Sequence, residues 1–363
     1  METTMGSAVT AVRTDRNAPL VSWSKQECEA FGVRPLVAKH RLDELDLFSD
    51  AALTELLEKY PHDRLQAFTM GTDPLEWTAW QPVDTAGASG RELFAAVQRG
   101  RLWLNVLQVH RVDQRYGDVL ERLYAGLSAQ SPGFHPSKTT ATLLISSPTA
   151  MVYYHTDAEP NLLWHIRGRK RIWIYPAQDR DLISQRLMED IFAHVVDEEV
   201  PYRREFDQKA VAFDLRPGEV ASWPQNAPHR VVNLEGVNVS LSTIHETEAS
   251  DRRKLVYCAN RLFHRTCHMP TRSTTETGIL SQTKRLAYRA LRRLDLVTSP
   301  SRRAYITNVR IDPGAPTGIS PIAGVPVLTE FSQKDFSLGR DVSGRLTAVP
   351  RHHTSKRGAR GAR

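Results

Sequence analysis

The sequence is poor in cysteine, with only Cys28, Cys258 and Cys267 among 363 residues. These three show no paired spacing, so a disulfide framework of the kind found in small secreted domains is not predicted. No run of about 18 apolar residues occurs, so no membrane span is expected. The first twenty residues are polar and lack the apolar stretch of a secretory signal. We therefore expect a cytoplasmic protein.

Common catalytic and zinc-binding patterns are also missing. No Gly-x-Ser-x-Gly occurs, so a serine hydrolase built on a nucleophile elbow is not predicted. Segment 258–270, CANRLFHRTCHMP, contains cysteines and histidines, but their spacing matches no strong zinc pattern. A structural role is the favoured interpretation of that segment.

The formal net charge of +7 is unevenly distributed along the chain. Acids outnumber bases over residues 1–250, and bases outnumber acids over residues 251–363. This asymmetry indicates an acidic globular part and a basic tail. Solubility is the favoured role of the tail, and contact with an acidic partner or nucleic acid is the alternative. The final stretch, RHHTSKRGARGAR, has no aromatic residue between its bases, so base stacking is not favoured.

Composition and patterning divide the chain into five segments. We expect a flexible N-terminus over 1–34, an α/β segment over 35–137, a β-rich catalytic core over 138–250, C-terminal helices over 251–297, and a basic, largely extended or disordered tail over 298–363. The core segment contains many short stretches rich in Val, Ile, Thr and aromatic residues, separated by Gly, Pro and Asn. Such a pattern favours a sandwich or barrel.

Capping residues and leucine spacing locate the helices. Helices are predicted over 49–61, 89–100 and 116–130, with a helical insert over 177–193 in the β-rich core. The basic segment 283–296, TKRLAYRALRRLDL, carries its leucines on one side. We expect that side to pack on the barrel or on a second copy of the chain. Its short length and thin apolar face disfavour a helix that lies on a membrane.

The residues with the most reactive side chains are concentrated in segment 153–176, YYHTDAEPNLLWHIRGRKRIWIYP. Residues two apart on a strand point to the same face, so His155 and Asp157 project into one cavity. His229, in RPGEVASWPQNAPHRVVN, stands at the start of a strand that can return beside the first. Two histidines and one carboxylate with open positions are the ligand set of non-haem Fe(II) oxygenases. A hydrogen-bonded core histidine is the alternative for His155.

A lysine close to this pair suggests an anion site. If the chain forms a hairpin at Gly168, Asn161 and Lys170 lie on the strands beside the metal ligands. A buried lysine without a partner is unfavourable, and an anionic cosubstrate would supply that partner. The alternative is that Lys170 is a solvated turn residue among the neighbouring arginines.

Taken together, these segments resemble the Jumonji-C (cupin-like) family of Fe(II)- and 2-oxoglutarate-dependent oxygenases, and the pattern is most similar to the asparaginyl-hydroxylase-like branch. The family pattern is His-x-Asp, an Asn six residues after the His, a Gly-x-Lys turn, and a late Gly-(Asp/Glu)-x(4)-Pro-x(4)-His segment. The matching positions are His155, Asp157, Asn161, Gly168 with Lys170, and Gly218 through His229. The similarity covers residues 35–250 and is specific within 140–245.

The resemblance implies a fold and a set of ligands. The fold is mainly β with flanking helices around a double-stranded β-helix (jelly-roll) core. His155, Asp157 and His229 would bind Fe(II), with O₂ and the cosubstrate at the remaining positions. Lys170 would bind the distal carboxylate of 2-oxoglutarate, and Asn161 would assist in the same pocket.

The sequence departs from the family pattern beside the first ligand. Many relatives place Thr or Ser three residues before it, where this chain has Val152. Tyr153, on the same face as the ligand, could hold the cosubstrate instead, and Ser240 and Ser242 are further candidates for the same pocket. His165 also alternates inward, and a satisfied core histidine is favoured over a group that supports the metal ligands.

The expected activity is a 2-oxoglutarate-dependent dioxygenase that releases succinate and CO₂. Hydroxylation of a protein or peptide side chain or of a small metabolite is expected, and N-demethylation proceeds from the same step. A non-catalytic cupin-type binding or regulatory protein and a cupin-type isomerase or lyase are the alternatives. The resemblance also implies a homodimer through the C-terminal helices.

Overall fold

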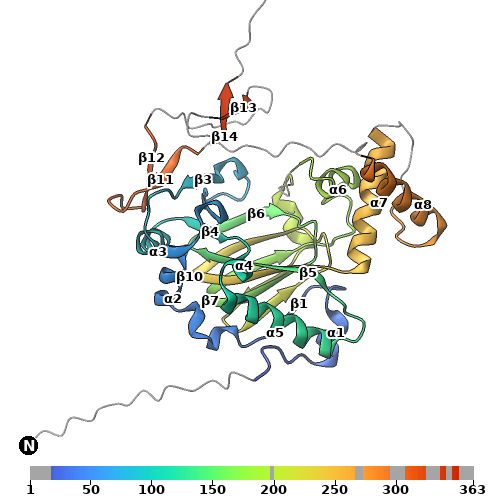
Figure 1. Cartoon of the computed structure of the whole chain (residues 1–363), viewed down its shortest axis with the longest axis horizontal. Coiled ribbons are helices and arrows are strands. Elements are labelled where there is room, and N and C mark those ends of the chain that lie inside the picture. Colours follow the sequence, from blue (N-terminus) through green and yellow to red (C-terminus); the bar gives the residue numbers. More distant parts are fainter. Residues whose placement is uncertain are drawn as a thin grey trace, which may run out of the picture.

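The computed structural model describes residues 18–196, 200–265, 273–294, 307–323, 336–340 and 346–350 (Figure 1). One twelve-stranded sheet dominates it, in the order β1-β9-β7-β10-β5-β4-β2-β3-β11-β12, with β6 beside β10 and β8 beside β7. Its strands are β1 (Leu36–Lys39), β2 (Leu65–Thr69), β3 (Gln81–Asp84), β4 (Leu102–Val106), β5 (Ser137–Ser146), β6 (Met151–His155), β7 (Asn161–Ile174), β8 (Val211–Leu215), β9 (Glu219–Ser222), β10 (His229–Glu246), β11 (Val309–Ile311) and β12 (Ile319–Pro321). A separate pair is formed by β13 (Phe336–Arg340) and β14 (Leu346–Pro350).

Helices flank this sheet. They are α1 (Lys25–Ala30), α2 (Asp50–Lys59), α3 (Gly90–Arg99), α4 (Val109–Val112), α5 (Gln114–Gln130), α6 (Gln185–Phe192), α7 (Glu248–Arg265) and α8 (Gly278–Arg293). The prediction of a mainly β, cupin-like fold with flanking helices is confirmed. None of the helices in the described ranges combines the length and the apolar character that a membrane crossing requires.

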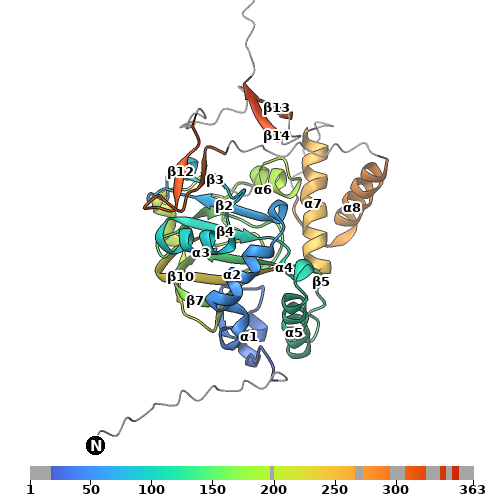
Figure 2. The ribbon, with the colours of Figure 1, turned by 60° about the vertical axis from the view of Figure 1, so that its left-hand side comes forward.

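Two groups of helices cover different parts of the sheet (Figure 2). Helices α2, α3 and α5 contribute leucines to the largest core cluster, which also contains Leu143, Trp164 and Leu241 of the sheet. Helices α6 and α7 form a second cluster around Tyr154 and Tyr175, at the other end of the molecule. The predicted caps are present: the Ser49 side chain accepts from Ala52 N, and Ser89 with Glu92 forms a capping box.

The central feature of the sheet is a bent ribbon made of β7 and β10. The two strands pair from His229 opposite Ile174 to Ile244 opposite Asn161. The predicted hairpin at Gly168 is therefore wrong, because β7 continues through this residue and bends there. Gly168 has φ +81°, and a Cβ atom would lie 2.7 Å from the Asn238 side chain. Only glycine fits that conformation and that close approach.

The bend changes which residues face the barrel interior. Before it, Leu163 points inward; after it, Ile172 and Ile174 belong to the same apolar cluster as Leu163. Before the irregularity the odd-numbered residues of β7 face the interior, and after it the even-numbered residues do. A β-bulge has the same effect on side-chain direction. Asn161 and Lys170 consequently face the same interior, although a regular strand would point them in opposite directions.

Both ends of the chain contain more structure than the sequence predicts. Within the N-terminal segment, residues 18–34 include α1 and bury Leu20, Val21 and Trp23 against the main core. Within the tail, Val309–Ile311 pairs in parallel with β3, and Ile319–Pro321 extends the same edge. Three-residue strands and long-range pairing leave little periodic signal in a sequence, so these contacts could not be predicted from it.

Three further differences concern element boundaries. The helical insert is confined to Gln185–Phe192, and α8 begins at Gly278, five residues before the predicted start. The predicted boundary between residues 137 and 138 falls at the start of β5, where β4 and β5 are neighbours in one sheet. Of the three cysteines, Cys28 and Cys258 are free thiols, and Cys267 lies outside the described residues.

Candidate metal centre

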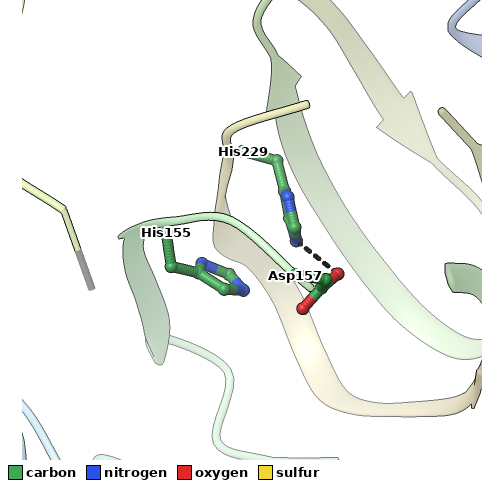
Figure 3. Close-up of side chains that lie close together, drawn as sticks. All are labelled: His155, Asp157 and His229. Atoms are coloured by element: carbon green, nitrogen blue, oxygen red, sulfur yellow. Dashed lines mark ion pairs between the residues drawn. The ribbon is translucent and has the colours of Figure 1, made fainter. Parts of the chain in front are cut away.

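Strand pairing brings the three predicted ligands together at one end of the barrel. His155 ends β6, His229 begins β10, and the two residues are direct neighbours in the antiparallel pair. Asp157 follows two residues after His155 and turns toward His229 (Figure 3). One potential ligand atom from each of the three residues lies within 4.8 Å of the other two. In the described residues no other group of three His, Cys, Asp or Glu side chains approaches so closely.

Both imidazoles are held in the tautomer that a metal needs. The Nδ1–H group of His155 donates to the backbone carbonyl of Tyr153 at 2.7 Å. The Nδ1–H group of His229 donates to the carbonyl of Ala227 at 3.1 Å. A carbonyl oxygen can only accept, so each proton lies on Nδ1 and each Nε2 lone pair is free. The Nε2 atom of His229 is 3.6 Å from Asp157 Oδ2, close enough for one cation to contact both.

The carboxylate is oriented by a short chain of polar side chains. Asn161 Nδ2 donates to Asp157 Oδ2 at 3.0 Å, and the Ser242 hydroxyl donates to Asn161 Oδ1 at 3.2 Å. Hydrogen bonds of this type fix the direction of a ligating carboxylate. Asn161 therefore contacts the metal ligand itself in this structure, and Ser242 orients Asn161.

A loop that precedes β10 braces the same site from the other side. Asn226 adopts a left-handed conformation with φ 65° and donates to the carbonyl of Asp157 at 2.8 Å. Gln225 donates to the carbonyl of Ala158 at 2.8 Å. The Trp223 ring lies 4.5 Å from the His229 ring, centroid to centroid. The sequence analysis missed these supports, and their only local signal is an asparagine in a Pro-flanked turn.

Burial keeps His229 neutral and ready to act as a ligand. Its side chain is 5 % exposed. Burial first, and then the neighbouring His155, lower the pKa of His229 to about 4. A neutral imidazole is the form that binds metals. The donor set of two imidazoles and one carboxylate, all on one side of the site, therefore fits a divalent transition metal.

Lys170 lies deep in the same barrel, on the far part of β7. Its side chain is 1 % exposed, so the alternative of a solvated turn residue does not hold. Its Nζ is 5.5 Å from the centre of the Trp103 ring, and no hydrogen bond or ion pair within the described residues satisfies the ammonium group. Burial lowers the pKa of Lys170 to about 7. A buried ammonium group without a hydrogen bond or ion pair is unfavourable unless an anion pairs with it.

The basic residues on either side of Lys170 have ion-pair partners, unlike Lys170 itself in the described part of the chain. Arg169 pairs with Glu235, and Arg171 pairs with Asp214, both at the surface. Asn233 lies directly opposite Lys170 on β10. Its Oδ1 is buried and accepts no hydrogen bond from the described residues. Two unsatisfied polar groups thus face one another across the β7–β10 pair, where a bound polar ligand could contact both.

The remaining candidates lie close to the site but have other contacts. The Tyr153 hydroxyl accepts from Gly71 N at 3.0 Å, and Val152 packs between two apolar clusters of the barrel. The Ser240 hydroxyl donates to His165 Nδ1 at 3.1 Å, while the Nε2–H group of His165 donates to Gly168 O. His165 is thus a satisfied core histidine, as favoured from the sequence. The hydroxyl groups of Tyr153 and Ser240 have no hydrogen bond to His155, Asp157 or His229; Tyr153 contacts His155 only through its backbone carbonyl.

The barrel and its site define a class of protein: a cupin-like β-barrel that presents two histidines and a carboxylate around an open face. Residues 91–251 match the family model described as a cupin-like domain. This match contains the three candidate ligands and Lys170. The chain therefore carries a cupin-like domain over these residues.

Solved structures with similar folds include the crystal structure of the Escherichia coli ribosomal oxygenase YcfD. That structure is 15 % identical over 77 % of this chain and 68 % of its own, with a TM-score of 0.42. A structure of YcfD in complex with cobalt and 2-oxoglutarate is 15 % identical over 74 % of this chain and 65 % of its own, with a TM-score of 0.41. The chain therefore spans about two thirds of the length of these proteins. No curated protein sequence matches it.

Proposed function

We propose that this protein is an Fe(II)- and 2-oxoglutarate-dependent oxygenase. The observation that carries the proposal is the pairing of two features in one barrel. One is a site in which one ring nitrogen of each of two histidines and a carboxylate oxygen lie within 4.8 Å of one another. The other is a fully buried lysine with no protein partner among the described residues. A metal site alone gives no reason to bury a lysine nearby. A dicarboxylate cosubstrate that binds the metal at one end and a lysine at the other would require both the open metal site and the buried lysine.

The roles of the residues follow from their contacts. His155, Asp157 and His229 hold the metal on one side and leave its other side for ligands. With 2-oxoglutarate and O₂, iron in such a site supplies an oxidative decarboxylation to succinate and CO₂ that is coupled to attack on a substrate C–H bond. Lys170 neutralises the distal carboxylate of 2-oxoglutarate in a charge-assisted contact. The expected outcome is hydroxylation of a protein or peptide side chain or of a small metabolite, or N-demethylation by the same step.

A non-catalytic cupin-type binding protein is the second candidate, with a cupin-type isomerase or lyase after it. The bracing of Asp157 by Asn161 and Ser242 favours the oxygenase, because a simple binding pocket has no need for an oriented carboxylate. Neither of these candidates consumes 2-oxoglutarate.

The test is turnover of 2-oxoglutarate by the full-length protein supplied with Fe(II) and ascorbate, alone and with cell extract or metabolite pools. Succinate formation that requires iron, and that disappears in Asp157→Ala, is the expected result. Metal binding without any succinate, with or without extract, would contradict the oxygenase and favour the binding protein. His62→Ala, which removes an exposed histidine outside the site, is the matched control.

A further inference from the structure

Helix α8 turns its apolar side toward solvent. Ile279, Leu280, Leu286 and Leu294, the last directly after the helix, are 81, 59, 64 and 67 % exposed. These four are among ten large exposed hydrophobic residues in the described parts of the chain, so exposure is concentrated here rather than scattered. In both Figure 1 and Figure 2, α8 lies at the outer edge of the molecule, beyond α7.

These side chains belong to one continuous stripe. At 3.6 residues per turn, neighbouring positions on the helical wheel cover an arc of about 140° with a single polar member, Thr283. The arc is formed, in order around the helix, by Leu286, Ile279, Ala290, Thr283, Leu294, Ala287, Leu280 and Leu291. We call this set the α8 stripe.

The side of α8 that packs on the protein is polar. Its buried residues are Ser281, Lys284 and Tyr288. Lys284 Nζ donates to Asn260 Oδ1 and to the Ser273 carbonyl, each at 2.8 Å. Rolling the helix to bury the stripe would break both bonds and leave Asn260 Oδ1 and the Ser273 carbonyl without this donor, which is unfavourable. The outward direction of the α8 stripe is therefore fixed by the fold.

The charge around the stripe restricts what can cover it. Residues 278–293 contain no acid but five bases, and Arg293 lies at the edge of the stripe, next to Leu286 on the helical wheel. A second copy of the chain, the partner that the sequence predicts, would bring like charges together. A parallel pair aligns arginine with arginine, and an antiparallel pair places Arg292 and Arg293 beside the positive N-terminal end of the other helix.

The size of the stripe also argues against a second copy of the chain as its partner. A helix of 16 residues is about 24 Å long and about 10 Å wide. One face of that size is small beside the roughly 800 Å² that each partner contributes to a stable protein interface. A lipid surface has no such minimum, because inserted apolar side chains and arginine–phosphate contacts add to one another.

We propose that the α8 stripe docks on an anionic phospholipid bilayer, with its apolar side chains inserted at the interface and Arg293, at the edge of the stripe, on the lipid phosphates. The helix lies flat on the membrane surface, and the barrel stays on the aqueous side. The basic residues of 251–363 add long-range attraction to the same surface. This inference is independent of the proposed function, because no metal ligand takes part in it.

The test is cosedimentation of the full-length protein with phosphatidylcholine vesicles, with and without about one third phosphatidylglycerol. We expect binding to the anionic vesicles, weakened at least tenfold by the double change Ile279→Ser and Leu286→Ser, since both side chains leave the interface. Leu234→Ser, at a 43 % exposed leucine on β10, is the matched control and retains wild-type binding. Arg293→Gln weakens binding a few-fold and reduces its dependence on salt.

Three outcomes would overturn the proposal. The protein could fail to prefer anionic vesicles, which would favour an acidic protein as the partner. The stripe double variant could bind as tightly as the wild type, which would assign the attraction to the basic tail alone. The double variant could change from dimer to monomer when its mass is measured in solution, which would make a second copy the occupant. Because the changed residues are exposed, an unchanged melting temperature is the check that the variants are folded.

Discussion

The candidate metal centre, from β6, the loop after it and the start of β10, lies in the same barrel as Lys170 on β7, but the polar groups of the two places differ in their hydrogen bonding. At the metal centre, Nδ1 of each histidine donates to a carbonyl, and Asp157 accepts from Asn161. At the other site, Lys170 is buried without a hydrogen bond in the described structure. The first site is held ready by the protein alone, and the second requires a ligand.

This difference explains how one barrel can bind two ligands in different ways. Orienting the metal ligands in advance lowers the entropy that metal binding must overcome. Leaving a buried ammonium group unpaired destabilises the empty protein, and a carboxylate that reaches it gains a strong charge-assisted bond. In the proposed function, the barrel would thus combine a rigid metal site with an anion site whose stability depends on the ligand.

The largest expected effect comes from breaking the rigid site. His155→Ala or Asp157→Ala should remove bound metal and all succinate formation, while the melting temperature of the metal-free protein changes little, because neither side chain belongs to an apolar core cluster. Metal content by atomic emission, with succinate release on the same samples, checks this. Wild-type metal occupancy in both variants would refute the assignment of these ligands.

The next effect concerns the anion site. Lys170→Met keeps the aliphatic length and removes the charge, so the apparent KM for 2-oxoglutarate should rise at least tenfold, equivalent to about 1.4 kcal/mol. Without 2-oxoglutarate, the same variant should melt at a higher temperature than the wild type, because it removes an unpaired buried ammonium. Arg171→Met, beside it but paired with Asp214, is the control and should leave KM unchanged. An unchanged KM in Lys170→Met would mean that another basic residue holds the carboxylate.

A dependence on pH separates the two sites further. With its pKa lowered to about 7 by burial, Lys170 loses its proton above neutral pH in the empty protein. The KM for 2-oxoglutarate should therefore rise by up to about tenfold per pH unit above about 7. In the unfolded chain this lysine keeps its proton up to about pH 10.4, so wild-type stability should rise with pH in between. The melting-temperature advantage of Lys170→Met should accordingly shrink between about pH 7 and 9, and a constant advantage would contradict the buried-charge explanation.

The smallest expected effect tests the support of the carboxylate. Ser242→Ala removes the hydrogen bond that orients Asn161, so metal affinity should fall a few-fold, at the lower edge of the roughly 10-fold to 100-fold seen for direct contacts to ligands. Ser240→Ala is the matched control, because its hydroxyl donates to His165 and has no hydrogen bond to Asp157 or Asn161. Titration of the metal-free proteins with Co(II) gives both affinities. If both variants lose the same metal affinity, the assignment of Ser242 rather than Ser240 as the support of the carboxylate is wrong.

The sequence was most informative where the signal is local. The His-x-Asp pair spans three residues, although β6 ends at His155 and Asp157 lies just beyond it, and the helix caps at Ser49 and Ser89 need only three or four neighbouring residues. It was least informative where the chain returns from far away. The packing of Trp23 and the pairing of β11 with β3 join parts of the sequence that carry no mutual signal.

Lys170 and Lys284 show what could be predicted from the sequence and what depended on the tertiary structure. By itself, the sequence determined which functional groups belong to the site, because imidazole, carboxylate and ammonium groups at these spacings are compatible with few other roles. Only the tertiary structure decided where they point. The bend at Gly168 turns Lys170 into the barrel, and the bonds of Lys284 turn the leucines of α8 outward. In both cases the physical reason is that a side chain's direction depends on contacts with residues distant in the sequence, and no local period records them.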